Sequence, residues 1–151
     1  MIYIGIDPAV AKQTAICIID GAKTQLFMVD TFDHTDLLKI LDGLAFDGSI
    51  TLCIESQTIY KSSKVRTKDI LEIANRSGFF EGLIMSYFGH KVLHIERPEP
   101  RDWKGQVPAD MYRRRILKNY PEVNLLTAGC TKVVQEDLCH AFGLAKYVEK
   151  K

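Results

Sequence analysis

The sequence predicts a single α/β domain over residues 1–151, built on a five-stranded mixed sheet flanked by helices. Three apolar and β-branched runs joined by short turns lie within residues 2–29, which is typical of an antiparallel meander. Beyond residue 30, helical patterns alternate with two more strand-like runs, which favours two parallel strands beside the meander. A chain of 151 residues has the length of one domain with a full core.

The first strand ends on a carboxylate. Apolar and small residues run directly into Asp7, and Pro8 ends the run. Desolvating a carboxylate at the end of a buried strand is unfavourable unless a partner compensates it. A metal ion, a phosphate-bound cation or a basic side chain would do so. Asp7 is therefore the first candidate functional residue, and its structural alternative is an acid that caps the following turn.

Hydrophobic periodicity predicts the remaining elements. Strands are expected at 14–20, 24–29, 50–55 and 91–96, and helices at 35–46, 67–88, 109–119 and 131–147. Asp33 or Thr35 is expected to cap the first helix. Residues 56–66 predict an exposed basic loop, and residues 97–104 a rigid, proline-bearing one. The strand at 50–55 again ends on an acid, Glu55, which repeats the feature seen at Asp7.

The composition is that of a soluble globular protein, with 46% hydrophobic and 26% charged residues. No run of 18 apolar residues predicts a membrane span, and no basic segment precedes the first strand, so the cytoplasm is the expected compartment. Cys17, Cys53 and Cys139 lie in apolar runs and are expected to be buried. A zinc site is not expected, because Cys130, Cys139 and His140 lack a fourth ligand at suitable spacing.

Charge is unevenly distributed along the chain. Residues 1–59 carry three basic and eight acidic side chains, whereas residues 60–118 carry thirteen basic and seven acidic ones. A basic central segment in a nearly neutral protein favours a surface that binds a polyanion, the alternative being a solvated basic helix. In the same segment, Gly78 and Gly82 lie four apart on one helix face, where they would allow close packing within the chain or between two copies.

Four side chains form the candidate catalytic group. The first and fourth strands can lie side by side, which would bring Asp7 and Glu55 together. Asp137 and His140 are three residues apart on a helix and share one face. Hard oxygen ligands with one imidazole suit Mg²⁺ or Mn²⁺. Two such ions about 4 Å apart would hold the attacking and leaving oxygens of a phosphodiester.

Three segments resemble the acidic motifs of RuvC-type Holliday junction resolvases, members of the ribonuclease H-like superfamily. The segments are Ile4-Gly5-Ile6-Asp7-Pro8, Cys53-Ile54-Glu55-Ser56-Gln57 and the run from Asp137 to Ala145. The resemblance covers residues 2–147 and implies a ribonuclease H-like fold. The first motif alone is weak, because sugar kinases and actin relatives share it, but three motifs in this order are more specific.

The resemblance implies the roles of individual residues. Asp7, Glu55 and Asp137 would be catalytic acids that bind two Mg²⁺ ions, or Mn²⁺, with His140 at the fourth position. His140 replaces the final acid usual in the bacterial enzymes, and Glu136 would be its substitute as ligand. Lys104 would contact the scissile phosphate. Further DNA contacts are expected from Gln57, Tyr60, Lys61, Lys64, Arg101, Lys104, Arg113, Arg114 and Arg115, and Tyr60 would stack on an unpaired base.

The activity that the resemblance implies is metal-dependent endonucleolytic resolution of four-way DNA junctions in recombination and repair, leaving 5′-phosphates. Paired symmetric cuts require two active sites and therefore a homodimer. Two alternatives stay open: a branched-DNA or flap nuclease of the same fold, and a catalytically weak protein that binds DNA junctions. A membrane partner is not expected.

Overall fold

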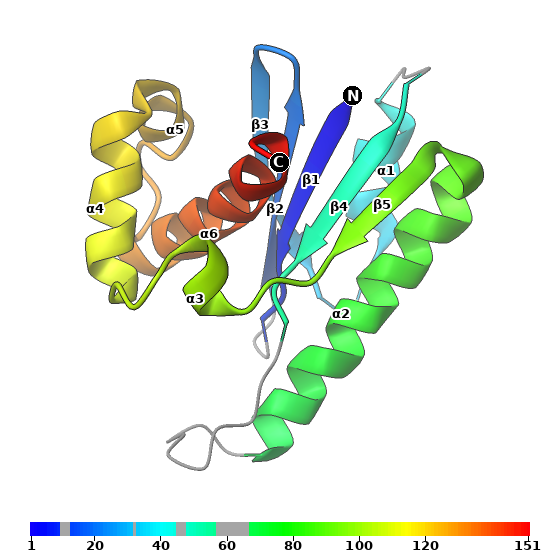
Figure 1. The fold of residues 1–151 in the computed structure, drawn as a ribbon, viewed down its shortest axis with the longest axis horizontal. Helices are drawn as coiled ribbons and strands as arrows, with labels where there is room; N and C mark the ends of the chain where they lie inside the picture. Colours follow the sequence, from blue (N-terminus) through cyan, green and yellow to red (C-terminus); the bar gives the residue numbers. More distant parts are fainter. Residues whose placement is uncertain (10–12, 32, 45–47, 57–66) are drawn as a thin grey trace.

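A five-stranded mixed sheet forms the centre of the computed structural model, which describes residues 1–9, 13–31, 33–44, 48–56 and 67–151 (Figure 1). The strands are β1 (Ile2–Asp7), β2 (Gln13–Asp20), β3 (Lys23–Asp30), β4 (Ile50–Ile54) and β5 (Val92–Glu96). Their order in the sheet is β3-β2-β1-β4-β5. The α/β class and the five-stranded mixed sheet predicted from the sequence are thereby confirmed.

The pairing of the strands agrees with a meander followed by parallel strands. β1 pairs with β2 and β2 with β3, both antiparallel, and Gly21 makes the β2–β3 turn with a φ of 55°, a conformation open mainly to glycine. β1 pairs with β4, and β4 with β5, in parallel. β1 and β4 are therefore parallel neighbours, and the acids predicted at their carboxyl ends, Asp7 and Glu55, lie at the same edge of the sheet.

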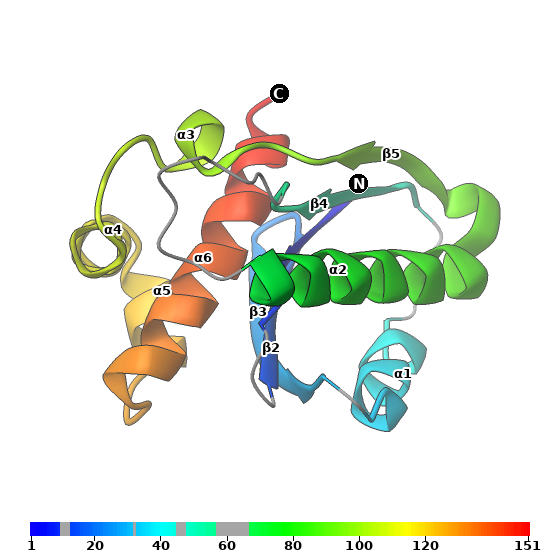
Figure 2. The ribbon, with the colours of Figure 1, turned by 90° about the horizontal axis from the view of Figure 1, so that it is seen from below.

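Helices cover both faces of the sheet (Figure 2). One face packs on α1 (Thr35–Asp42) and α2 (Thr67–Phe88), through a core in which Ile4, Ile16 and Phe80 are fully buried. The opposite face packs on α6 (Lys132–Glu149), on which α4 (Ala109–Asn119) packs in turn, and Cys17 and Phe142 are fully buried in this second core. β2 lies between the two helical layers, so its side chains are buried on both faces of the sheet. The strict alternation of buried and exposed residues that is typical of a sheet covered on one face is therefore absent.

Several element boundaries differ from the sequence-based expectation. Two short helices were not predicted, α3 (Pro100–Trp103) and α5 (Pro121–Leu126), and both begin with a proline at the first helical position, where its missing N–H is no loss. The 3₁₀ turn η1 (Gly89–Lys91) follows α2, so β5 begins at Val92 rather than at Lys91. Because α3 lies within residues 97–104, the segment predicted as a rigid loop is partly helical.

The cap predicted for the first helix is realised in part, and α6 has a cap that was not predicted. The residue before α1 is His34, but the Asp33 carboxylate accepts a hydrogen bond from the Thr35 amide at 3.0 Å. Thr131 caps α6, where its hydroxyl oxygen accepts a hydrogen bond from the Val134 amide at 3.4 Å.

Within the described ranges, no helix is both long enough and apolar enough to cross a bilayer.

Candidate active site

The candidate catalytic residues lie where the carboxyl ends of β1 and β4 meet α6. Asp7 is the last residue of β1, and Glu55 directly follows the last residue of β4. The parallel register pairs Ile6 with Ile54, so the two acids leave the same edge of the sheet. Asp137 and His140 lie on α6, which packs across β1. The adjacency predicted for the first and fourth strands is thus present.

Gly5 sets the distance between β1 and α6. A Cβ atom at this position would lie 2.1 Å from the Ala141 carbonyl oxygen and 2.5 Å from the Ala145 amide nitrogen. The backbone of α6 therefore rests directly on β1, beginning at Ala141, the residue after His140, and two residues before Asp7 on the strand. A glycine inside a strand pattern is a recognised sign of such a close approach, and this was the available sequence signal for the contact.

Asp7 and His140 contact each other directly. The Asp7 Oδ2 and His140 Nδ1 atoms are 3.3 Å apart, and both side chains are largely buried. The imidazole is enclosed by two aromatic rings, with centroid distances of 5.6 Å to Trp103 and 5.8 Å to Tyr112. These walls hold the ring against Asp7, and its buried Nε2 atom has no hydrogen-bond partner among the described residues.

Glu55 forms an ion pair with Lys104. Their Oε2 and Nζ atoms are 3.9 Å apart, and each side chain is less than one-fifth exposed. A backbone hydrogen bond of 2.8 Å from the Ser56 amide to the Pro98 carbonyl joins the end of β4 to the segment that carries Lys104. Burial raises the pKa of the Glu55 carboxyl above its ordinary value, which Lys104 counteracts and the charge of Asp7 reinforces.

Asp137 experiences the same crowding of negative charge. The pKa of its carboxyl is raised to about 6, first by burial and then by the charges of Asp7 and Glu136, while His140 opposes this rise. Asp7 thus acts electrostatically on both of the other acids, which places it at the centre of the group. Protein cations balance this negative charge only in part.

The residues present match a hard divalent cation in chemistry. Three carboxylates and one imidazole with a bare buried nitrogen form the donor set that Mg²⁺ or Mn²⁺ accepts, and a cation would relieve the repulsion that raises these pKa values. In the part of the chain that the structure describes, however, no three His, Cys, Asp or Glu side chains are arranged around one point as metal ligands. Asp7 and His140 instead contact each other.

Glu136 is directed away from this group. Its Oε1 atom lies 3.9 Å from both Arg113 Nε and Lys132 Nζ. Since Glu136 faces these two cations, the geometry favours His140 over Glu136 at the fourth position.

The three successive arginines of α4 have different surroundings. Arg113 is mostly buried and donates to Gln135 Oε1 at 2.8 Å and to Asp110 Oδ1 at 2.9 Å. This arrangement does not favour a direct DNA contact by Arg113. Arg114 is exposed and pairs with Asp110, whereas Arg115 is exposed on the α6 side.

The other predicted DNA contacts are less well placed by the structure. Arg101 is exposed and lies 2.9 Å from Glu99 Oε2. Gln57, Tyr60, Lys61 and Lys64 fall outside the described residues.

Sequence reasoning missed the aromatic wall beside His140. Trp103 and Tyr112 pack edge to face at 5.2 Å, and Gly143 makes room for them, since a Cβ there would meet the Tyr112 hydroxyl and the Trp103 ring. Their positions in a predicted loop and in a basic helix carried no signal for this role.

No protein-family model and no curated protein matches this sequence.

Proposed function

We propose that this chain is a metal-dependent endodeoxyribonuclease that resolves four-way DNA junctions. The observation that carries the proposal is the convergence of Asp7, Glu55, Asp137 and His140 at one edge of the sheet, with Lys104 beside Glu55. These groups come from four separate elements, and like charges gathered in this way are characteristic of functional sites. The resemblance of the three acidic segments to RuvC-type resolvases supplies the substrate class.

The chain's own side chains have distinct parts in this proposal. Asp7, Glu55 and Asp137, with His140, would hold one or two Mg²⁺ ions, or Mn²⁺. Such ions, when bound, supply charge stabilisation and an activated water for phosphodiester hydrolysis. His140 orients the Asp7 carboxylate through its 3.3 Å contact, and Trp103 and Tyr112 keep that imidazole in place. Lys104 stabilises negative charge that develops on the phosphate.

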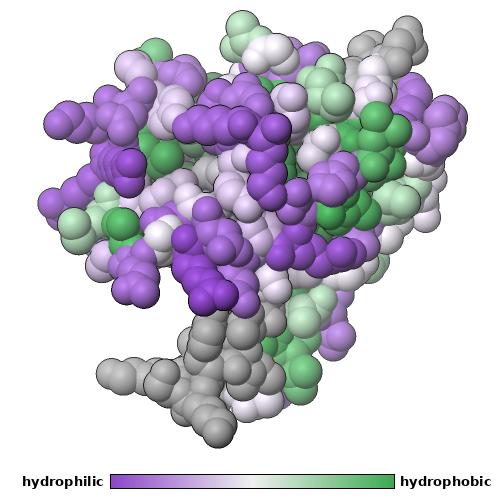
Figure 3. All heavy atoms as spheres, in the orientation of Figure 1, coloured by the Kyte–Doolittle hydropathy of each residue, from purple (hydrophilic) through white to green (hydrophobic). Residues whose placement is uncertain are grey.

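A homodimer forms part of the proposal, because paired symmetric cuts need two active sites. The N-terminal part of α2 extends beyond the sheet in Figure 1, and Figure 3 shows hydrophobic residues at the surface along it. Leu71, Phe79 and Met85 are exposed on this helix. Among the described residues, a Cβ added at Gly78 or Gly82 meets nothing within 4 Å. This face therefore has room for a second copy of α2.

A cleavage assay tests the activity. A four-way junction and a duplex of matched sequence are incubated with the protein, with Mg²⁺, with Mn²⁺ and with EDTA. We expect paired cuts in the junction alone, only with a divalent ion, leaving 5′-phosphates. Asp7→Asn should reduce cleavage by a factor of about 10²–10³, as loss of one preorganised electrostatic group does in other enzymes, while leaving binding intact.

Asp20→Asn provides the matched control for the Asp7 variant. Asp20 is an exposed strand-end acid that pairs with Ile2, at the opposite end of β1 from Asp7. It should cut at the wild-type rate. Cleavage by Asp7→Asn at the wild-type rate would show that the site is assigned incorrectly.

A catalytically weak junction-binding protein is the second candidate. The contact between Asp7 and His140, and the lack of a formed three-ligand group in the described residues, favour it. The same assay separates the two, since this candidate binds the junction tightly and leaves it uncut with either ion. Cleavage of flaps in preference to four-way junctions would instead indicate the branched-DNA nuclease.

A further inference from the structure

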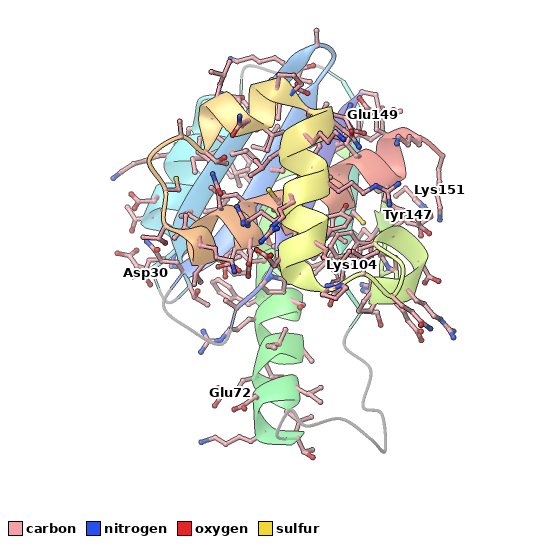
Figure 4. The ribbon with its side chains drawn as sticks, turned by 90° about the vertical axis from the view of Figure 1, so that its left-hand side faces the viewer. Asp30, Glu72, Lys104, Tyr147, Glu149 and Lys151 are labelled. Atoms are coloured by element: carbon pink, nitrogen blue, oxygen red, sulfur yellow. The ribbon has the colours of Figure 1, made fainter. Side chains whose placement is uncertain are left out.

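A pocket of about 680 Å³ lies between α3, α4 and the C-terminal end of α6. This volume is in the range of pockets that hold ligands of nucleotide size or larger, and one phosphate ion would fill only a small part of it. Figure 4 shows Lys104, Tyr147 and Lys151 on the same side of α4, near the end of α6. The pocket is separate from the Asp7–His140 contact, although Trp103 borders both.

The charge of the pocket is strongly one-sided. Five basic residues line it, and no aspartate or glutamate does so among the described residues; the five are Lys104, Arg115, Lys146, Lys150 and Lys151. They come from three elements: Lys104 follows α3, Arg115 is on α4, and the other three are at the C-terminal end of α6. Several cations without a lining carboxylate repel one another, so an anionic ligand between them would be stabilising.

Two of these cations are available for a ligand. Lys146 pairs with Glu149, and Lys151 pairs with Glu96 at 2.9 Å. Arg115 and Lys150 are exposed, and neither forms an ion pair within the described part of the chain. Arg115 belongs to α4 and Lys150 to the end of α6, so an anion held by both would bridge the two helices.

A structural role explains only part of this arrangement. Lysines in the last turn of a helix complement its dipole, and that would account for Lys146 and Lys150 on α6. It does not account for Arg115 on α4 or for Lys104 after α3. The convergence of cations from three elements therefore points to a ligand.

Lys104 connects the pocket to the candidate active site, because it lines the pocket and also lies 3.9 Å from Glu55. The remaining surface is partly aromatic: Trp103 and Tyr147 line it, with Lys104 Nζ 5.0 Å from the centroid of the Trp103 ring and Lys151 Nζ 4.6 Å from that of Tyr147. We propose that the pocket binds the phosphodiester backbone of a DNA strand as it continues beyond the candidate active site. The inference rests on the proposed function for the identity of the strand, since the pocket chemistry specifies phosphate-bearing nucleotides.

Salt-dependent binding in EDTA tests this inference without any cleavage. The full chain carrying both Arg115→Ala and Lys150→Ala is compared with wild type and with a control carrying Lys23→Ala and Lys39→Ala. The control loses the same charge from exposed positions outside the pocket. Affinity for a four-way junction is measured by fluorescence anisotropy between 50 and 200 mM salt.

We expect the slope of log K against log salt to become shallower by about two in the pocket variant, close to 0.9 for each lost phosphate contact. The control should keep the wild-type slope. Arg115→Gln and Lys150→Gln, made singly, should each change the slope by about one. All these residues are exposed, and equal urea midpoints for the variants and wild type verify folding.

Three results would overturn the inference. The first is a salt slope of the pocket variant equal to that of the control, and the second is absence of junction binding by the wild-type chain. The third is a deoxynucleoside monophosphate that binds wild type and not the variant, while the two have the same salt slope for the junction. The last result would assign the pocket to a free nucleotide. A junction that is bound with the expected slopes but never cut would contradict the proposed nuclease activity and leave the pocket assignment standing.

Discussion

Replacing Gly5 by alanine tests how closely β1 and α6 pack. The added Cβ would lie 2.1 Å from the Ala141 carbonyl oxygen and 2.5 Å from the Ala145 amide nitrogen, whereas ordinary contact begins near 3.4 Å. Both obstacles are backbone atoms inside a helix and cannot rotate away, so strand or helix must shift by roughly 1 Å. Overpacking of this kind costs about 1–3 kcal/mol or more, and we expect a loss of about 3 kcal/mol.

The sign of the effect is diagnostic. Without the overlap, Gly→Ala at an ordinary backbone conformation stabilises by about 0.4–1 kcal/mol. Urea unfolding followed by circular dichroism gives the free energy of unfolding, and the melting temperature should fall by roughly 6–12 °C. Because α6 also carries His140, cleavage should decline with stability.

Gly43→Ala is the matched control for this experiment. Gly43 has a φ of −72°, and the nearest described atoms to an added Cβ, the carbonyl oxygens of Lys39 and Ile40, would lie 3.5 Å away. Its free energy of unfolding should match or slightly exceed that of wild type. If Gly5→Ala also unfolds within about 0.5 kcal/mol of wild type, the close approach of β1 and α6 is refuted.

Three further predictions concern Asp137, the α2 surface and the α6 cap. The Asp137 carboxyl has a raised pKa of about 6, so the folded state favours its protonated form and stability is lost as pH rises from about 4 through 6. In EDTA, Asp137→Asn should therefore have the urea midpoint of wild type near pH 4 and a higher one at pH 7. A difference in urea midpoint that does not depend on pH would contradict this. If the proposed dimer forms through α2, Gly82→Glu should convert it to monomer in sedimentation without lowering the urea midpoint, because no described residue lies within 4 Å of a Cβ added there. A dimer of unchanged affinity would place the interface elsewhere. Thr131→Ala removes the α6 cap and should lower the unfolding free energy by about 0.5–1 kcal/mol, since its hydrogen bond of 3.4 Å is long; an unchanged urea midpoint would show that the cap contributes nothing.

Much of the candidate site could be predicted because its signals are local. Asp7 and Glu55 each end a short apolar run. Because the run has clear limits in the sequence, the position of the acid at the end of the strand can be predicted from it. Asp137 and His140 share a face through helical geometry alone. The meander then leaves one side of β1 open to a later strand, and β4 occupies it.

The orientation of the α4 arginines could not be predicted in the same way. Successive helical residues point about 100° apart, so three arginines in a row cannot all have the same surroundings. Arg113 faces α6 and donates to Gln135 there, and it also donates to Asp110 one turn earlier on α4, whereas Arg115 lines the pocket. Charge counted along the chain also missed the pocket, because residues 119–151 balance in sequence while their lysines gather in space.

The sequence by itself determined the α/β class, the five strands and the acids that end β1 and β4, because hydrophobic period and strand ends are set by neighbouring residues. The tertiary structure decided what surrounds those acids. Only packing brings Trp103 and Tyr112 against His140, and Lys104 beside Glu55. These contacts join residues from separate elements, and their distances depend on how closely the layers approach. At Gly5 that approach is limited by the absence of a single side chain.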